Sequence, residues 1–175
     1  MTRGLVVDVT PDGLFGRASA TFDTDRIYRY ALTRTWDDTL PTVTFVMLNP
    51  STADAFGVDP TIRRCLDFSK REGAGELRVV NLFALRSTNP KALYAHPDPV
   101  GPANDEHIVR AAETSGVVVV GWGAHGALHG RGAAVRRLLP RMRCLAVTKS
   151  GHPGHPLYVR GDAPLIPYPA RGVVP

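Results

Sequence analysis

The sequence contains little cysteine and no long hydrophobic run. Cys65 and Cys144 are the only two cysteines among 175 residues, and without a Cys-x-x-Cys pair they favour neither a disulfide framework nor a cysteine-rich zinc site. No apolar run approaches the roughly 20 residues that cross a bilayer. The N-terminal segment lacks the hydrophobic region of a signal peptide. We therefore expect a cytoplasmic protein that has no contact with membranes.

The motifs of several large enzyme classes are also missing. There is no Walker-type Gly-Lys-Ser/Thr, no Gly-x-Ser-x-Gly and no kinase signature. The stretch GWGAHGALHGRG lacks the order Gly-x-Gly-x-x-Gly directly after a strand, which argues against a dinucleotide site. His125 and His129 have the spacing of a helical metal site, but glycines flank both and the His-Glu-x-x-His pattern is absent. We expect neither a metal ion nor an organic cofactor.

The composition is that of a single domain spanning residues 1–175. The chain is 43% hydrophobic and 21% charged, and no internal repeat or low-complexity linker divides it. Lysine and arginine number 21 against 16 acidic residues, which leaves a net charge of +5. Such a charge favours polyanions as partners without requiring them.

Four apolar segments have the features of buried strands. Each is rich in β-branched residues and bounded by Gly, Pro or Asn, and none alternates strictly between apolar and polar residues, as is usual for strands covered on both faces. The segments are 42–48, 76–85, 116–123 and 142–150.

Helical patterns separate these strands. Residues 59–73 begin with Asp-Pro and stop at a glycine, residues 102–116 contain capping residues at the start, and residues 131–142 form a helix that Pro140 ends. Strands alternating with helices indicate a parallel sheet with helices on both faces. The predicted fold is α/β, with three α/β/α layers around a central, mostly parallel sheet of four strands.

The two ends of the chain are different. Residues 1–40 are predicted to be an N-terminal β extension, because 26–37 alternate like an antiparallel edge strand or hairpin. Residues 160–175 are rich in proline and are predicted to form an extended tail.

Polar residues follow each predicted strand. In open α/β sheets ligands bind beyond the carboxyl ends of the strands, so these residues are expected to converge on one site. An Asn-Pro pair after a single strand is more often a turn, but four sets at corresponding strand ends favour a site. The sets are Asn49, Ser51, Thr52 and Asp54; Asn81, Arg86, Ser87 and Thr88; Trp122 and His125; and Thr148, Lys149, Ser150, His152 and His155.

Two features among these sets stand out. Asn81 interrupts an apolar strand, where a buried amide without partners costs about 1–3 kcal/mol. Its partner is either a ligand, such as the donor and acceptor edge of a nucleobase, or a neighbouring loop. The loop GHPGHPLY presents His152 and His155, which are either donors to a developing anion or incidental residues of a rigid turn.

In this order, the segments resemble motifs of the uracil-DNA glycosylase superfamily across residues 45–159. A closer resemblance is to a bacterial and phage domain family, named without an activity, that carries MLNPSTAD, DPTIRRC, NLFA, DPVG and HPLY. The superfamily motifs resembled here are MLNPSTAD, LRVVNLFALR, VVVVGWGAHG and TKSGHPGHPLYV.

The superfamily resemblance implies a glycosylase-like fold and a role for each matching residue. Asn49 would position the attacking water, but the fast members have aspartate there, so a proton acceptor such as Asp54 is needed from the same loop. The final loop is one residue longer than usual, so His152 and His155 compete for one role, with His155 preferred. Base contacts fall to Asn81, Phe56 and Leu48, and DNA contacts to Ser51, Arg86, Lys149, Ser150 and Arg160.

The function implied is hydrolysis of the N-glycosidic bond of a uracil-type or otherwise damaged base flipped from DNA, as in base excision repair. The protein is expected to be a monomer, and two cysteines exclude the four-cysteine iron-sulfur cluster of some superfamily branches. Two other functions remain open. One is a nucleic-acid or nucleotide-binding module without catalysis, and the other is a hydrolase of free modified nucleosides or nucleotides.

Overall fold

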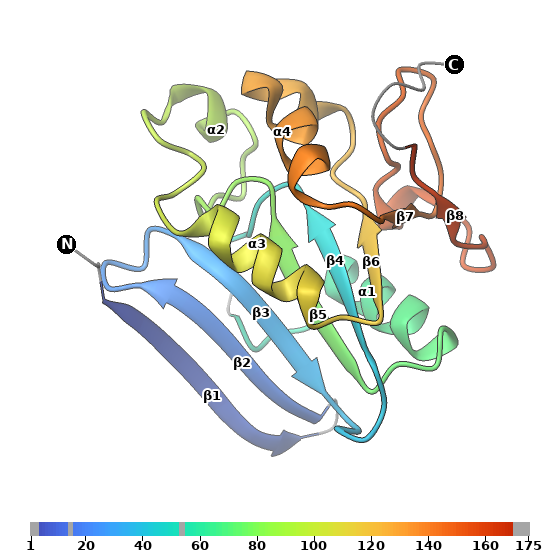
Figure 1. Ribbon diagram of the computed structural model, residues 1–175. Coiled ribbons are helices and arrows are strands. Elements are labelled where there is room, and N and C mark those ends of the chain that lie inside the picture. The colour runs from blue at the N-terminus through green and yellow to red at the C-terminus, as the bar shows by residue number, and fades with distance from the viewer. Residues whose placement is uncertain (1–3, 14–15, 53–54, 170–175) are drawn as a thin grey trace.

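The computed structural model describes residues 4–13, 16–52 and 55–169, which build one sheet with helices against both of its faces (Figure 1). The sheet has eight strands in the order β1-β2-β3-β5-β4-β6-β7-β8. The strands are β1 (Leu5–Gly13), β2 (Gly16–Asp23), β3 (Arg29–Thr35), β4 (Thr42–Met47), β5 (Glu76–Asn81), β6 (Val117–Val120), β7 (Arg143–Cys144) and β8 (Ile166–Pro167).

The predicted α/β class is confirmed, whereas the prediction of a mostly parallel sheet of four strands is wrong, because the sheet is mixed and has eight strands. Strands β5, β4, β6 and β7 are parallel and correspond to the four apolar segments. The antiparallel strands β1 to β3 extend the sheet on one side through the pairing of β3 with β5, and β8 pairs antiparallel with β7. Within residues 1–40, Tyr30 and Leu32 of β3 are buried. The alternation in this segment therefore belongs to a strand in the sheet interior.

The helices follow the predicted positions between strands. α1 (Pro60–Arg71) covers one face and α3 (Asn104–Glu113) the other, and α2 (Ala92–Ala95) and α4 (Arg131–Leu138) complete the set, with short 3-10 turns at Ala124–Gly130 and Pro156–Tyr158. None of the helices formed by the described residues is long and apolar enough to cross a membrane.

Alternating residues of the parallel strands build a separate core on each face. Phe45 and Val79 pack on the α1 face with Leu66, whereas Val46 and Val80 pack on the α3 face. Because both faces are covered, the strand segments are apolar without a break. The same alternation directs the last side chains of β4 and β5, Met47 and Asn81, toward the α1 face.

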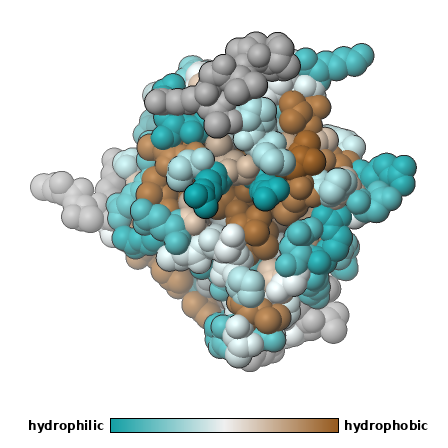
Figure 2. All heavy atoms as spheres, turned by 45° about the vertical axis from the view of Figure 1, so that its right-hand side comes forward, coloured by the Kyte–Doolittle hydropathy of each residue, from teal (hydrophilic) through white to brown (hydrophobic). Residues whose placement is uncertain are grey.

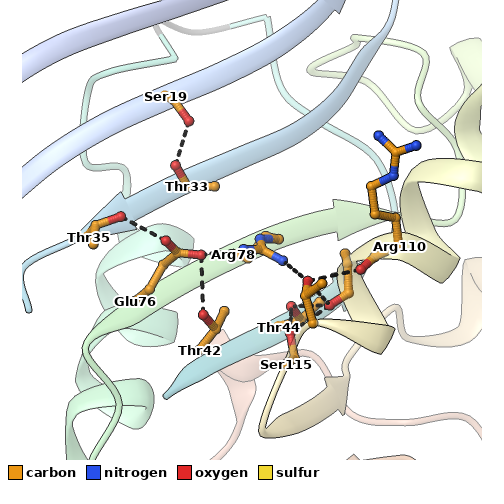
Figure 3. Close-up of polar contacts among 11 residues, drawn as sticks. Ser19, Thr33, Thr35, Thr42, Thr44, Glu76, Arg78, Arg110 and Ser115 are labelled. Atoms are coloured by element: carbon orange, nitrogen blue, oxygen red, sulfur yellow. Dashed lines mark hydrogen bonds and ion pairs between the residues drawn. The ribbon is translucent and has the colours of Figure 1, made fainter. Parts of the chain in front are cut away.

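A satisfied polar network closes the amino ends of the parallel strands (Figure 3). Glu76 accepts hydrogen bonds from the hydroxyls of Thr35 (2.9 Å) and Thr42 (3.4 Å), which join β3, β4 and β5. The buried hydroxyl of Thr44 lies 2.5 Å from that of Ser115, just after α3. The polar groups at this end of the sheet therefore have partners within the protein.

Gly75 joins three segments next to this network. Its carbonyl accepts from the backbone N–H groups of Trp36 and Asp37, and its own N–H donates to the Pro41 carbonyl. A Cβ atom at this position would lie 1.8 Å from the Asp37 carbonyl oxygen. Only glycine allows the backbone to approach so closely.

We therefore expect Gly75→Ala to lower the free energy of unfolding by about 1–3 kcal/mol or more, the cost of overpacking. Urea unfolding measures this change. Gly13→Ala in β1 is the matched control, because a Cβ there meets nothing within 4 Å and should leave stability within about 1 kcal/mol of the parent. Equal stability of the two variants would contradict the close contact at Gly75.

Candidate functional site

A cleft of about 700 Å³ lies beyond the carboxyl ends of the parallel strands, on the α1 face of the sheet. Its floor includes Arg29, Met47, Val79 and Asn81 from three adjacent strands. The walls come from residues within 48–51, 59–62, 122–125, 146–148 and 154–159. Figure 2 turns the β7 and β8 side of the molecule forward, and hydrophobic residues gather near the centre of that face between hydrophilic ones.

Backbone pairing continues past the strands and places the cleft loops. The N–H of Leu82 donates to the Met47 carbonyl (2.9 Å), and the N–H of Phe83 donates to the Leu48 carbonyl (3.0 Å). On the other side of β4, the N–H of Gly121 donates to the Val46 carbonyl (2.9 Å). The segments that follow β5 and β6 are thereby held beside the loop that follows β4.

Asn49 braces this loop and also lines the cleft. Its Nδ2 donates to the carbonyls of Pro50 (3.1 Å) and Ser87 (2.9 Å). Both amide hydrogens are therefore engaged, and Oδ1 is the atom left to accept a hydrogen bond from a ligand or water. The side chain can orient a water molecule, but it cannot take its proton.

Asn81 lies on the cleft floor and is 4% exposed. Its backbone carbonyl accepts from Nδ2 of Asn104 (2.9 Å), but its carboxamide makes no hydrogen bond with any residue that the structure describes. The sequence left open that a neighbouring loop bonds to this carboxamide. Among the described residues, no loop does so. The carboxamide therefore presents a free donor and a free acceptor to the cleft.

His155 lines the cleft, whereas His152 does not. Nδ1 of His155 accepts from the backbone N–H of Leu157 (3.2 Å), so the neutral ring carries its proton on Nε2. Burial lowers the pKa of His155, and the negative charge of Asp59 partly opposes this shift. His155 is thus a neutral hydrogen-bond donor near neutral pH.

Two charged residues of the cleft lining, Asp59 and Arg29, were not among the predicted site residues. Asp59 caps α1, where it accepts from the backbone N–H of Ile62 (2.8 Å), and it also faces the cleft. The Asp-Pro pair in the sequence predicted that Asp59 caps the helix. The position of this helix start just beyond the strand ends could have indicated that Asp59 also faces the cleft. Arg29 enters from β3. The sequence could have indicated Arg29, because it is a charged residue between Tyr28 and Tyr30. Strand alternation places its side chain on the face of the sheet opposite to those two tyrosines.

Trp122 forms an aromatic wall and is 2% exposed. A Cβ on Gly126 would lie 2.1 Å from Cδ1 of the indole, so only glycine leaves room for the ring there. Tyr168 packs edge-on against it, with ring centroids 5.8 Å apart.

The structure divides the predicted site residues into two groups. Leu48, Asn49, Ser51, Asn81 and His155 converge on the cleft. Outside its lining lie Phe56, Arg86, Lys149, Ser150, His152 and Arg160, and Asp54 lies outside the described residues.

The residues outside the lining have different surroundings. Arg86 donates to the carbonyls of Arg26 (2.9 Å) and Thr52 (3.2 Å), and Arg160 forms an exposed ion pair with Asp162 (2.8 Å). Lys149 and Ser150 are exposed in a turn. In the described part of the chain, no three His, Cys, Asp or Glu side chains come together as a metal site.

Comparison with protein families shows which family this chain matches. Residues 29–157, well over half of the 175 residues, match the family described as "Protein of unknown function (DUF1643)". No curated protein matches the sequence. The matched region begins at Arg29 and ends at Leu157, so it includes nearly all of the segments that line the cleft.

The tautomer and pKa of His155 can be measured by NMR. We expect the Nε2–H tautomer, because Nδ1 accepts from Leu157, and a pKa below the ordinary 6.5, because the ring is partly buried. Asp59→Asn should lower the pKa of His155 further by removing a negative charge. A pKa depressed in the folded state also makes acidification below pH 6.5 destabilising, since the unfolded chain binds the proton more readily. A pKa at or above 6.5 would contradict this description of the site.

Proposed function

The chain belongs to the DUF1643 family, and we propose that its cleft binds a nucleobase and that the protein hydrolyses the N-glycosidic bond of a uracil-type or otherwise damaged base flipped from DNA. The observation that carries the proposal is the free carboxamide of Asn81 on the cleft floor. The resemblance of four sequence segments to the uracil-DNA glycosylase superfamily supports it independently.

Asn81 and its surroundings suit a planar base. A carboxamide matches the adjacent donor and acceptor on a base edge, and leaving it unpaired in a buried site costs about 1–3 kcal/mol. Met47, Val79 and Trp122 supply apolar surface around it. A volume of about 700 Å³ is within the range of small-molecule sites and accommodates one nucleotide.

The other cleft residues suit the chemistry of glycosidic hydrolysis. As the bond between the base nitrogen and the sugar carbon breaks, its electron pair leaves with the base, and Nε2–H of His155 donates to that developing anion. Water, oriented by Oδ1 of Asn49, bonds to the sugar carbon. In the proposed mechanism Asp59 accepts the proton of this water, and the products are a free base and an abasic sugar.

A hydrolase of free modified nucleosides or nucleotides is the second candidate. Two of the cations assigned to DNA phosphates have partners within the protein, since Arg86 donates to backbone carbonyls and Arg160 pairs with Asp162. Lys149 is exposed for a phosphate contact. A free nucleoside has no phosphate chain to neutralise, so it needs fewer unpaired cations than DNA does. This observation favours the second candidate.

One assay separates these functions. The protein is incubated with oligonucleotides that contain uracil, hypoxanthine or mismatched thymine, and with the corresponding free nucleosides, and released base is quantified by chromatography. Alkali-labile abasic sites support the glycosylase, and binding that weakens as salt rises supports DNA as the partner. Release from free nucleosides alone supports the second candidate. Binding without any release would sink the hydrolase proposal and leave a binding module.

Asn81→Leu tests the base-reading role. We expect base affinity to fall about tenfold or more, the value of one lost hydrogen-bonding group, while the melting temperature stays the same or rises. Asn104→Leu is the matched control, because Nδ2 of this buried residue donates to the carbonyls of Asn81 and Leu82. That variant should lose stability. Unchanged base affinity in Asn81→Leu would contradict the proposed contact.

Asp59→Asn separates helix capping from catalysis. Asparagine caps helices as well as aspartate does, so stability should stay within about 0.5 kcal/mol, whereas Asp59→Ala should lose about 1 kcal/mol. If Asp59 accepts the proton of the attacking water, Asp59→Asn should slow base release about 100-fold or more. Single-turnover rates measure this effect. An unchanged rate, together with loss of activity in Asp54→Asn, would assign the step to Asp54.

A further inference from the structure

Arg29 is a buried cation on the cleft floor that has no partner within the described residues. It is 6% exposed, and its guanidinium forms no hydrogen bond or ion pair with any of them. Its Nε is enclosed and unpaired, although the side chain lines the cleft. Its backbone is fixed, because its N–H donates to the Ala84 carbonyl (2.9 Å).

The other two buried arginines, unlike Arg29, have hydrogen-bond partners within the protein. Arg34 donates to the carbonyls of Thr33, Ala55 and Gly57, and Arg131 donates to the Leu82 carbonyl and pairs with Asp105. Both are therefore structural residues. A buried charge without a partner is strongly unfavourable, so Arg29 needs a different explanation.

The charge on Arg29 persists in spite of this environment. Burial, opposed by the negative charge of Asp59 and reinforced by the positive charges of Arg86 and Arg34, lowers the pKa of Arg29 to about 10. The guanidinium therefore remains protonated at neutral pH. A compact anion that enters the cleft would meet guanidinium N–H groups that donate to none of the described residues.

Arg29 and Asn81 enter the cleft from neighbouring strands. β3 runs antiparallel to β5, with Leu32 opposite Val79, and the N–H of Arg29 donates to the carbonyl of Ala84, three residues after Asn81. Both side chains line the same cleft. A ligand that fills the cleft floor therefore meets the guanidinium and the carboxamide.

We propose that Arg29 and Asn81 jointly recognise a nucleobase whose buried edge carries negative charge, either as a carboxylate or as an ionised ring nitrogen. The choice of a nucleobase rests on the function proposed above. Arg29 thereby selects negatively charged bases over neutral ones. In hydrolysis the same contact stabilises the base anion that forms when the electron pair of the glycosidic bond moves to the base.

Isothermal titration calorimetry on the full-length protein tests this selectivity with three probes. Orotate is a uracil that carries a carboxylate, uracil is its neutral counterpart, and inorganic phosphate presents an anion without a ring. We expect orotate to bind about ten- to a hundredfold more tightly than uracil, the range of one charge-assisted hydrogen bond. Equal binding of orotate and uracil, or no binding of either, would overturn the proposal, as would binding of phosphate alone.

Variants separate recognition from a structural role. Arg29→Met should abolish the preference for orotate and raise the melting temperature, because a buried unpaired charge is removed. Arg29→Lys should retain part of the preference. Arg34→Met is the matched control and should lower the melting temperature, since three backbone carbonyls lose their donor. If Arg29→Met fails to fold or keeps the preference for orotate, Arg29 is structural and the proposal falls.

The outcome is independent of hydrolysis. Orotate selectivity that depends on Arg29, without release of base from any substrate, would uphold the anion site and reject the glycosylase. Base release that is unchanged in Arg29→Met would uphold hydrolysis and reject the anion site.

Discussion

The parallel pairing of β4 with β5 and β6 positions the strand ends and the loops around which the cleft forms. Met47 lies opposite Asn81 and Val46 opposite Val120, so the three strands end at nearly the same level. Hydrogen bonds from Leu82 to Met47 and from Gly121 to Val46 then carry the pairing into the loops. This pairing helps to bring Asn49 and Asn81 to the same cleft, although 31 residues separate them along the chain. A shift of the pairing register by one residue would turn Asn81 toward the opposite face of the sheet, into the apolar core on the α3 side.

Polar side chains at the two ends of the sheet differ in whether they have hydrogen-bond partners within the protein. At the amino ends of the parallel strands, Glu76 and Thr44 form hydrogen bonds with other residues of the protein, so their role is to stabilise the fold. At the carboxyl ends, the carboxamide of Asn81 and the guanidinium of Arg29 have none among the described residues. Folding does not require these two buried groups, because apolar residues in their place would avoid the desolvation cost. The contrast between the two ends, within one sheet, is the physical argument that the cleft is a ligand site.

The sequence allowed prediction of the parts that depend on local pattern. Residues 42–48 and 76–85 have the uninterrupted β-branched character of doubly covered strands, and β4 and β5 form there. Asp59 and Pro60 mark a helix start that the structure reproduces. The pairing of β3 with β5 could not be predicted, because it joins distant segments and the alternation of residues 26–37 fits an edge strand equally well. Arg29 was missed for the same reason. Its importance depends on which strand lies beside it and on what it lacks, and neither is a local property of the sequence.

A bound anion would act on the charged and titratable groups of the cleft in the same way as Asp59. Burial lowers the pKa of both Arg29 and His155, and the negative charge of Asp59 partly opposes this shift for each of them. A negative charge that develops on a bound base acts in the same direction as Asp59. It strengthens the interaction with Arg29, which is already cationic, and it raises the proton affinity of His155, which burial keeps neutral in the empty cleft. The hydrogen bond from Nε2–H of His155 to the base therefore becomes stronger as negative charge develops on the base. A site built on a fixed imidazolium would instead add a second buried cation beside Arg29, and the desolvation of two like charges would oppose its formation.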